Sequence, residues 1–101
     1  MSIMSSLIDK ESLRVQFMIA EYEKELISLP KGSIKTKTVG NRIYYYLNYR
    51  DGKKVISKYV GKDEASLQTV KVGLERRVHI ETMLKKLKEE RKQIKKLGAL
   101  L

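Results

Sequence analysis

The chain lacks cysteine and tryptophan, and its 101 residues include only one proline and one histidine. Without cysteine there can be neither a disulfide nor a thiolate metal site. The single histidine, His79, cannot form a multi-histidine metal centre, and no acidic residue stands beside it to complete a nucleophile triad. We therefore expect a protein that is not an enzyme and that holds no metal or other cofactor.

Long apolar runs are also absent. No stretch approaches the roughly 18 residues that a membrane-spanning helix needs. The first residues, "MSIMSSLIDKESL", lack the basic region followed by an apolar region that marks an export signal. These absences predict a soluble, cytoplasmic protein that does not act at a membrane.

Acidic residues are scarce in one part of the chain. The formal net charge is +10, and residues 31–62 carry nine Lys or Arg against one Asp. Residues 1–30 carry three basic and five acidic residues, and residues 63–101 carry ten and six. A local excess of this size indicates a negatively charged partner rather than a particular fold.

The first segment has the apolar spacing of an amphipathic helix, which we expect over residues 9–28. Pro30 should end it, because the residue before a proline is disfavoured in helical conformation. The predicted apolar stripe contains Leu13, Phe17, Ala20 and Ile27, widened by Ile19, Tyr22 and Leu26.

The middle segment changes to strand periodicity. Gly40-Asn41 and Asp51-Gly52 have the composition of two-residue hairpin turns. They divide the segment into three predicted antiparallel strands, residues 33–39, 42–50 and 53–60, which are rich in tyrosine and β-branched residues.

The turns also predict which residues face one another across the strands. Val39 should face Arg42 across the first turn, and Arg50 should face Lys53 across the second. One side of the sheet is then more aliphatic, and we expect it to face the core; it carries Ile34, Thr36, Thr38, Ile43, Tyr45, Leu47, Tyr49, Lys54, Ile56, Lys58 and Val60. The other side alternates cations with aromatic rings.

The last segment predicts a long helix over residues 63–97, with Asp63 as its N-cap and Gly98 at its end. The start of this helix, with Leu67, Val70 and Leu74, can cover the sheet. A heptad seam follows, and it is the predicted surface for a partner or a second copy: Ile80, Met83, Leu87, Ile94 and Leu97. The N-terminal helix of the same chain can also cover this seam, since its glutamates complement the lysines there. The fold class is therefore α+β, helix–strand–strand–strand–helix, in a single domain spanning residues 1–101.

The side of the sheet that combines cations with tyrosines predicts a nucleic-acid interface, with DNA favoured over RNA. Cations can contact phosphates, while tyrosines stack on bases or donate hydrogen bonds. The candidate residues are Lys35, Lys37, Arg42, Tyr44, Tyr46, Arg50, Lys53 and Tyr59. Two alternatives remain: tyrosines also pair across strands for packing, with lysines protecting exposed edges, or the face binds a protein.

A different class of function is a protein-interaction module that acts through the long helix. Such a protein would be an antitoxin-like component, or an inhibitor, encoded by a phage or mobile element, of a nucleic-acid-processing enzyme. The heptad seam and the small size of the chain favour this hypothesis.

Four short motifs give the chain a family resemblance: Gly32-Ser33, Tyr44-Tyr45-Tyr46-Leu47, Gly52-Lys53 and Tyr59-Val60. With the heptad-rich helix that follows, they make residues 30–97 resemble a family of small bacterial and archaeal domains of unknown function. Some members of that family look to have a cysteine cluster in the first turn. This chain has Gly40-Asn41 there, so the resemblance implies no metal and no activity.

Three strands followed by a helix also resemble the small arm-binding DNA domains of integrases, the tyrosine recombinases. The stretch "YYYLNYRDGKKVISKYVGK" is similar to segments near the N-termini of some transposases. In the integrase domains the sheet enters the major groove of DNA. The resemblance implies that the exposed residues of the sheet would do so here.

Overall fold

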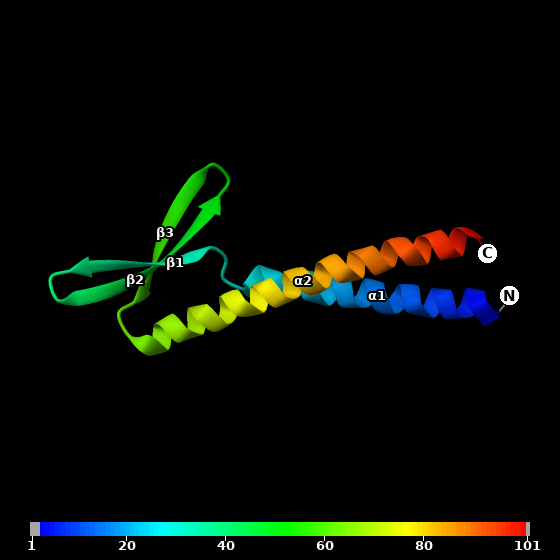
Figure 1. Ribbon diagram of the computed structural model, residues 1–101, viewed down its shortest axis with the longest axis horizontal. Coiled ribbons are helices and arrows are strands. Elements are labelled where there is room, and N and C mark those ends of the chain that lie inside the picture. The colour runs from blue at the N-terminus through cyan, green and yellow to red at the C-terminus, as the bar shows by residue number, and fades with distance from the viewer. Residues whose placement is uncertain (1–2, 101) are drawn as a thin grey trace. The chain divides into compact units, whose positions relative to one another are not determined.

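The computed structural model describes residues 3–100 and confirms the α+β order of elements (Figure 1). The elements are α1 (Ile3–Ser28), β1 (Ser33–Val39), β2 (Arg42–Asp51), β3 (Lys54–Gly61) and α2 (Glu64–Leu100). Helix α1 begins before the predicted start at Asp9. Helix α2 continues through Gly98 to Leu100, so the prediction that Gly98 ends the helix was wrong.

The chain folds into two compact units. A helical unit comprises α1 and the part of α2 from His79 onward, and a sheet unit spans Leu29–Val78. The sheet unit therefore contains all three strands and the first part of α2.

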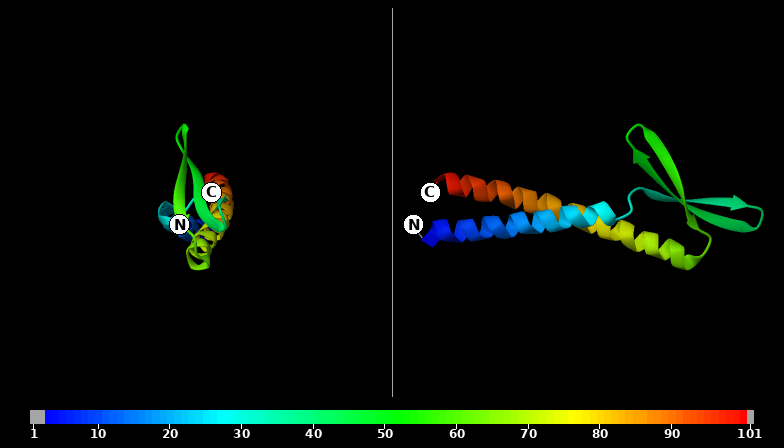
Figure 2. Two further views of the ribbon diagram at one scale, coloured as in Figure 1. Left: turned by 90° about the vertical axis from the view of Figure 1, so that its left-hand side faces the viewer. Right: turned by 180° about the vertical axis from the view of Figure 1, so that it is seen from behind.

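In the helical unit, α1 lies alongside the second part of α2 and runs antiparallel to it (Figures 1 and 2). Its buried side chains are Val15 and Ile19 from α1 and Ile80, Leu84 and Leu87 from α2. Ion pairs join the helices at the surface. Lys88 Nζ lies 3.1 Å from Glu23 Oε1, and Arg14 Nη2 lies 3.6 Å from Glu90 Oε2. The pair of Glu23 with Lys88 is of the kind expected from the sequence, an α1 glutamate with an α2 lysine, and it forms within one chain.

The predicted apolar stripe of α1 is mostly not the buried one. Leu13, Phe17 and Ile27 are 68%, 66% and 88% exposed, whereas Val15 and Ile19 are buried. Helix α1 carries two apolar stripes on different sides, and spacing alone does not tell which side packs against another helix. The stripe that packs continues through Tyr22 and Leu26, which are half-buried.

The sheet is antiparallel, with the strand order β1-β2-β3. The register between β1 and β2 is as predicted, from Val39 opposite Arg42 to Ser33 opposite Asn48. Gly40 has a φ of 62° and no residue other than glycine has positive φ among those described. This combination fits a type II′ turn, in which glycine takes the first of the two central positions.

The register predicted between β2 and β3 was wrong. Arg50 faces Val55 rather than Lys53, and Asp51 faces Lys54. The turn consists of Gly52 and Lys53, because Gly52, with a φ of 62°, again takes the first position of the turn. The partner shifts by two residues, and a shift of two leaves every side chain on its predicted side of the sheet.

The predicted core side of the sheet is the more buried one. Leu47 is buried there, and Leu67 of α2 is the other buried side chain of this unit. Half-buried side chains accompany them: Ile34, Tyr45, Tyr49, Ile56 and Val60 from the sheet and Val70 and Leu74 from α2.

Helix α2 begins at an N-cap, as predicted. The backbone N–H of Ser66 donates a hydrogen bond to Asp63 Oδ1 at 2.9 Å. Hydrogen bonds from the side chain and the backbone of Ser66 hold the pKa of Asp63 below its usual value.

Candidate nucleic-acid interface

The side of the sheet opposite the core carries the predicted site residues, and we call it the basic tyrosine face. Cross-strand pairing brings several of them together: Lys35 faces Tyr46, Lys37 faces Tyr44, and Tyr46 faces Tyr59 on its other side. The basic tyrosine face comprises Lys35, Lys37, Arg42, Tyr44, Tyr46, Arg50 and Tyr59 on the strands. Lys53, the eighth predicted residue, lies in the turn between β2 and β3 rather than at the start of a strand.

Three tyrosines form a packed cluster at the middle of this face. The ring centroid of Tyr59 lies 5.5 Å from that of Tyr46 and 6.3 Å from that of Tyr44, with interplanar angles of 56° and 49°. These are the tilted arrangements that aromatic rings prefer. The pairing of β2 with β3 is irregular beside this cluster. Tyr46 faces Tyr59 but Tyr45 faces Gly61, so the register shifts by one residue in a β-bulge. Tyr44 and Tyr46 are half-buried, and Tyr59 is 51% exposed. Tyr59 therefore presents the largest free ring surface.

The five predicted cations are all exposed: Lys35, Lys37, Arg42, Arg50 and Lys53. Within residues 3–100, none of their side chains forms a hydrogen bond, an ion pair or a cation–π contact. Their charges are therefore balanced only by solvent and counterions. By contrast, Lys31 lies over the ring of Tyr49 on the core side, with Nζ 5.6 Å from the ring centroid.

The cations lie along β1, at both ends of β2 and in the turn after β2, so they flank the tyrosine cluster on the β1 side and at its two ends. Arg42 and Arg50 mark the two ends of β2, which at about 3.3 Å per residue places their Cα atoms roughly 26 Å apart. Tyr44 and Tyr46 lie between them. The arrangement suits a ligand with negative charge on two sides and uncharged groups at its centre.

The sequence places Val39 and Val55 on this face, but the predicted site residues do not include them. Val39 is 56% exposed and Val55 is 66% exposed. Val39 faces Arg42 and Val55 faces Arg50, so each lies beside a predicted cation. Alternate residues of a strand point to the same side of the sheet, so this periodicity was the signal for adding Val39 and Val55 to the predicted site.

The predicted partner seam of α2 is largely packed within the chain. Ile80 and Leu87 are buried, Met83 and Ile94 are half-buried, and Leu97 is 53% exposed. The role of these residues in binding a second chain stays a prediction. Leu84, which the seam omitted, is also buried, and its spacing of four from Ile80 and three from Leu87 was the available signal.

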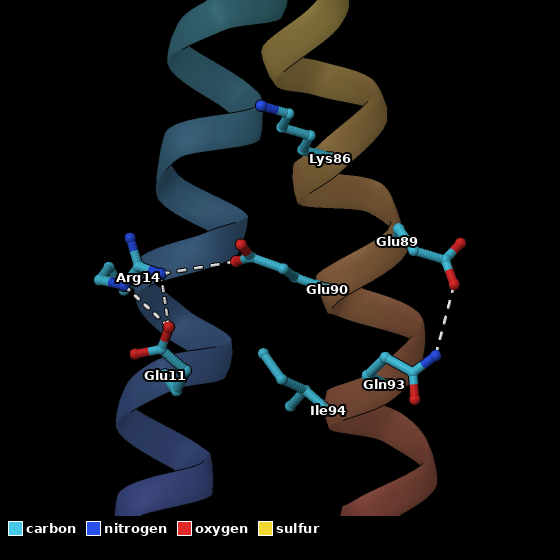
Figure 3. A pocket seen from close by; sticks show the side chains of 7 residues that line it. All are labelled: Glu11, Arg14, Lys86, Glu89, Glu90, Gln93 and Ile94. Carbon is cyan, nitrogen blue, oxygen red and sulfur yellow. Dashed lines mark hydrogen bonds and ion pairs between the residues drawn. The ribbon is translucent and has the colours of Figure 1, made fainter.

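An open surface pocket on the helical unit is lined by residues of both helices (Figure 3). Arg14 Nε donates a hydrogen bond to Glu11 Oε1 at 3.0 Å, and this bond lowers the pKa of Glu11. Arg14 also pairs with Glu90, and Gln93 Nε2 donates to Glu89 Oε1 at 3.3 Å. Most of the polar lining is thus paired within the pocket.

In the part of the chain that the structure describes, the histidine, aspartate and glutamate side chains form no group of three or more that is able to hold a metal ion. Neither of its helices is long and apolar enough to cross a bilayer.

Among known protein families, a model described as a domain of unknown function (DUF6788) matches residues 8–69. The matched segment includes most of α1, the whole sheet and the first turns of α2. It thus starts earlier and ends earlier than the predicted span of 30–97. No curated protein and no solved structure matches the chain.

Proposed function

The chain belongs to the DUF6788 family of domains of unknown function, and we propose that it is a small, non-catalytic nucleic-acid-binding protein. One observation carries the proposal: five exposed cations, whose side chains have no partner among the described residues, flank a tyrosine cluster on one side of the sheet or in the turn beside it. Clustered lysine and arginine side chains are the groups that contact the phosphates of a nucleic acid.

Binding would begin with the phosphates. Lys35 and Lys37 on β1, with Arg42 and Arg50 on β2, are the phosphate contacts, and Lys53 adds charge at the turn. Each contact releases condensed counterions, so affinity should fall steeply as salt is added. The exposed ring of Tyr59 supplies a contact to a base or sugar, supported from behind by Tyr44 and Tyr46.

Duplex DNA is the favoured ligand. A single strand is often held by several open aromatic rings, whereas Tyr44 and Tyr46 are half-buried against Tyr59. The B-form major groove, about 12 Å wide, admits β-structure and has phosphates along both edges. The deep, narrow major groove of A-form RNA does not admit protein side chains in this way. The resemblance to integrase arm-binding domains implies the same type of docking.

The test is fluorescence anisotropy with labelled duplex and single-stranded oligonucleotides over a salt series. The Lys35→Glu/Lys37→Glu variant should bind much more weakly and give a smaller salt slope. The matched control is Lys54→Glu/Lys58→Glu, because both lysines are exposed on the same sheet but on its other side. This control makes the same change in net charge and should retain most of the affinity.

Two outcomes would contradict the proposal. Equal losses in both variants would mean that net charge, rather than the basic tyrosine face, drives binding. No binding by the unaltered protein at about 50 mM salt, where phosphate contacts are strong, would exclude a nucleic-acid role for this face. Circular dichroism of each variant checks that the fold is retained.

The alternative function, a protein-interaction module acting through the seam of α2, has less support. Of its five predicted residues, only Leu97 is exposed, because α1 of the same chain lies alongside this part of α2.

A further inference from the structure

Helix α1 has an apolar stripe on the side that faces away from its packed stripe. Leu13, Phe17, Ala20 and Ile27 follow one another at steps of four, three and seven residues, and all four are exposed. The side chains that pack, Val15 and Ile19, lie on the other side of the helix. A helix within a single chain ordinarily places polar residues on its outer side, so an apolar outer stripe indicates a second contact.

The stripe has the spacing of a coiled-coil seam. Extended in both directions, it alternates steps of three and four residues through Ile3, Ser6, Lys10, Leu13, Phe17, Ala20, Lys24 and Ile27. In heptad terms Lys10, Phe17 and Lys24 share one position, and Leu13, Ala20 and Ile27 share the other. These two sets decide which partner orientation fits.

We propose that α1 binds α1 of a second copy of this chain, antiparallel, with Phe17 packed on Ala20 of the copy. This inference is independent of the proposed function, because it concerns the helical unit alone.

Side-chain volume supports this register. An antiparallel pair of helices places each residue of one heptad set against a residue of the other set. Phe17 then lies against Ala20, Leu13 against Lys24, and Lys10 against Ile27. Two-fold symmetry repeats each contact. A large ring over a small methyl fills the space at the centre, and the lysine stems cover the leucine and isoleucine while their charges reach water.

Charge supports the same orientation. In this register Arg14 flanks the seam beside Glu21 of the copy, and symmetry gives two such pairs. Glu21 is exposed and forms no ion pair among residues 3–100. The Arg14 side chain is half exposed, so it has surface left for a further contact beside those with Glu11 and Glu90. A parallel pair would instead place Lys10 on Lys10 and Lys24 on Lys24, which repel.

The first test is the mass in solution, measured by sedimentation velocity over roughly 1–300 μM protein, where a self-association equilibrium of moderate strength is visible. We expect a dimer that dissociates on dilution. Phe17→Glu should raise the dissociation constant of the dimer by roughly 100-fold or more, because two-fold symmetry makes this central aromatic contact twice. The control is Leu97→Glu, which changes an apolar residue of α2 that is similarly exposed and should leave the dimer intact.

The second test fixes the orientation. The chain has no cysteine, so single cysteines report contacts without interference. A mixture of Leu13→Cys and Lys24→Cys chains should form a disulfide between copies. Leu13→Cys alone should not, because antiparallel helices place the two thiols roughly 16 Å apart along the axis.

Three results would overturn the inference. The first is a monomer at every concentration, which would mean that the apolar stripe of α1 does not bind a second copy and contacts a different protein. The second is a dimer that Phe17→Glu does not weaken. The third is efficient cross-linking of Leu13→Cys to itself, which would require parallel helices.

Discussion

The guanidinium of Arg77 donates hydrogen bonds to the backbone at Pro30 and Leu29. Its Nε donates to the carbonyl oxygen of Pro30 at 2.7 Å, and its Nη2 donates to that of Leu29 at 3.0 Å. The two carbonyls lie between α1 and β1, where no helix or strand partner satisfies them. A residue of α2 thus holds the loop that leads into the sheet, over a sequence separation of 47 residues.

Replacing Arg77 by lysine should destabilise the protein by about 1.5–3 kcal/mol, because one ammonium group cannot reproduce two hydrogen bonds in a planar fork. Urea denaturation measures the change. Arg50→Lys is the control, since Arg50 is exposed on the sheet, and it should change stability little. Equal stabilities for the two variants would mean that the bonds of Arg77 contribute nothing net.

Two glycines of α2 should respond to alanine in opposite directions. A Cβ at Gly73 would lie 2.6 Å from Pro30 Cγ and 2.7 Å from Pro30 Cδ, so Gly73→Ala forces the loop away from the helix. We expect a net loss of about 1–2 kcal/mol, because crowding outweighs the better helix propensity of alanine. At Gly98 a Cβ meets nothing within 4 Å, so Gly98→Ala should gain a few tenths of a kcal/mol by propensity alone. A stabilised Gly73→Ala protein would contradict the close approach of Pro30.

The N-cap of α2 should make stability depend on pH. The pKa of Asp63 is lower in the folded protein than in the unfolded chain, because Ser66 donates hydrogen bonds to the carboxylate. Its contribution is therefore complete above the unfolded value of about 3.9 and is lost as pH falls through the lower folded value. The melting temperature of the unaltered protein should exceed that of Asp63→Ala by several degrees at neutral pH, and the gap should narrow below about pH 4. Asp9→Ala, within α1, is the control, and a gap independent of pH would argue against the ionised cap.

The ion pair between Glu23 and Lys88 should contribute little. The two side chains are 52% and 47% exposed, and pairs of this kind typically couple by about 0.2–1 kcal/mol. A double-mutant cycle with Glu23→Gln and Lys88→Met measures the coupling. We expect it to disappear near 1 M salt, where the Debye length is about 3 Å. A coupling that persists there would indicate a pair better shielded from solvent than its exposure implies.

The sheet shows how far local signals determine a register. Gly40-Asn41 predicted the β1–β2 pairing because glycine stands first in the turn and the strands follow directly. Asp51-Gly52 predicted the wrong turn between β2 and β3. The sequence also allows a turn of Gly52 and Lys53, in which glycine takes the first central position, and the structure has that turn. The basic tyrosine face was still predicted, because the error of two residues preserves the alternation of sides. The tyrosine cluster depends on the true register, which places Tyr59 opposite Tyr46 rather than Tyr44.

In the helices, local signals do not determine which side is buried. The long helix and the charge pairing with α1 followed from the sequence, but the choice between two apolar stripes of α1 did not. Both Val15-Ile19 and Leu13-Phe17 have helical spacing, and only the placement of α2 beside one of them decides which is buried. For the same reason the predicted seam of α2 did not include Leu84, which is buried.

The helical unit is built from the two ends of the described chain, and this has a consequence for synthesis on the ribosome. Helix α1 emerges before the sheet unit, and its packing partner, the part of α2 from His79 onward, emerges after it. All residues of the sheet unit are therefore synthesised before α1 can make its native contacts. The apolar side chains of Val15 and Ile19 remain uncovered during that interval.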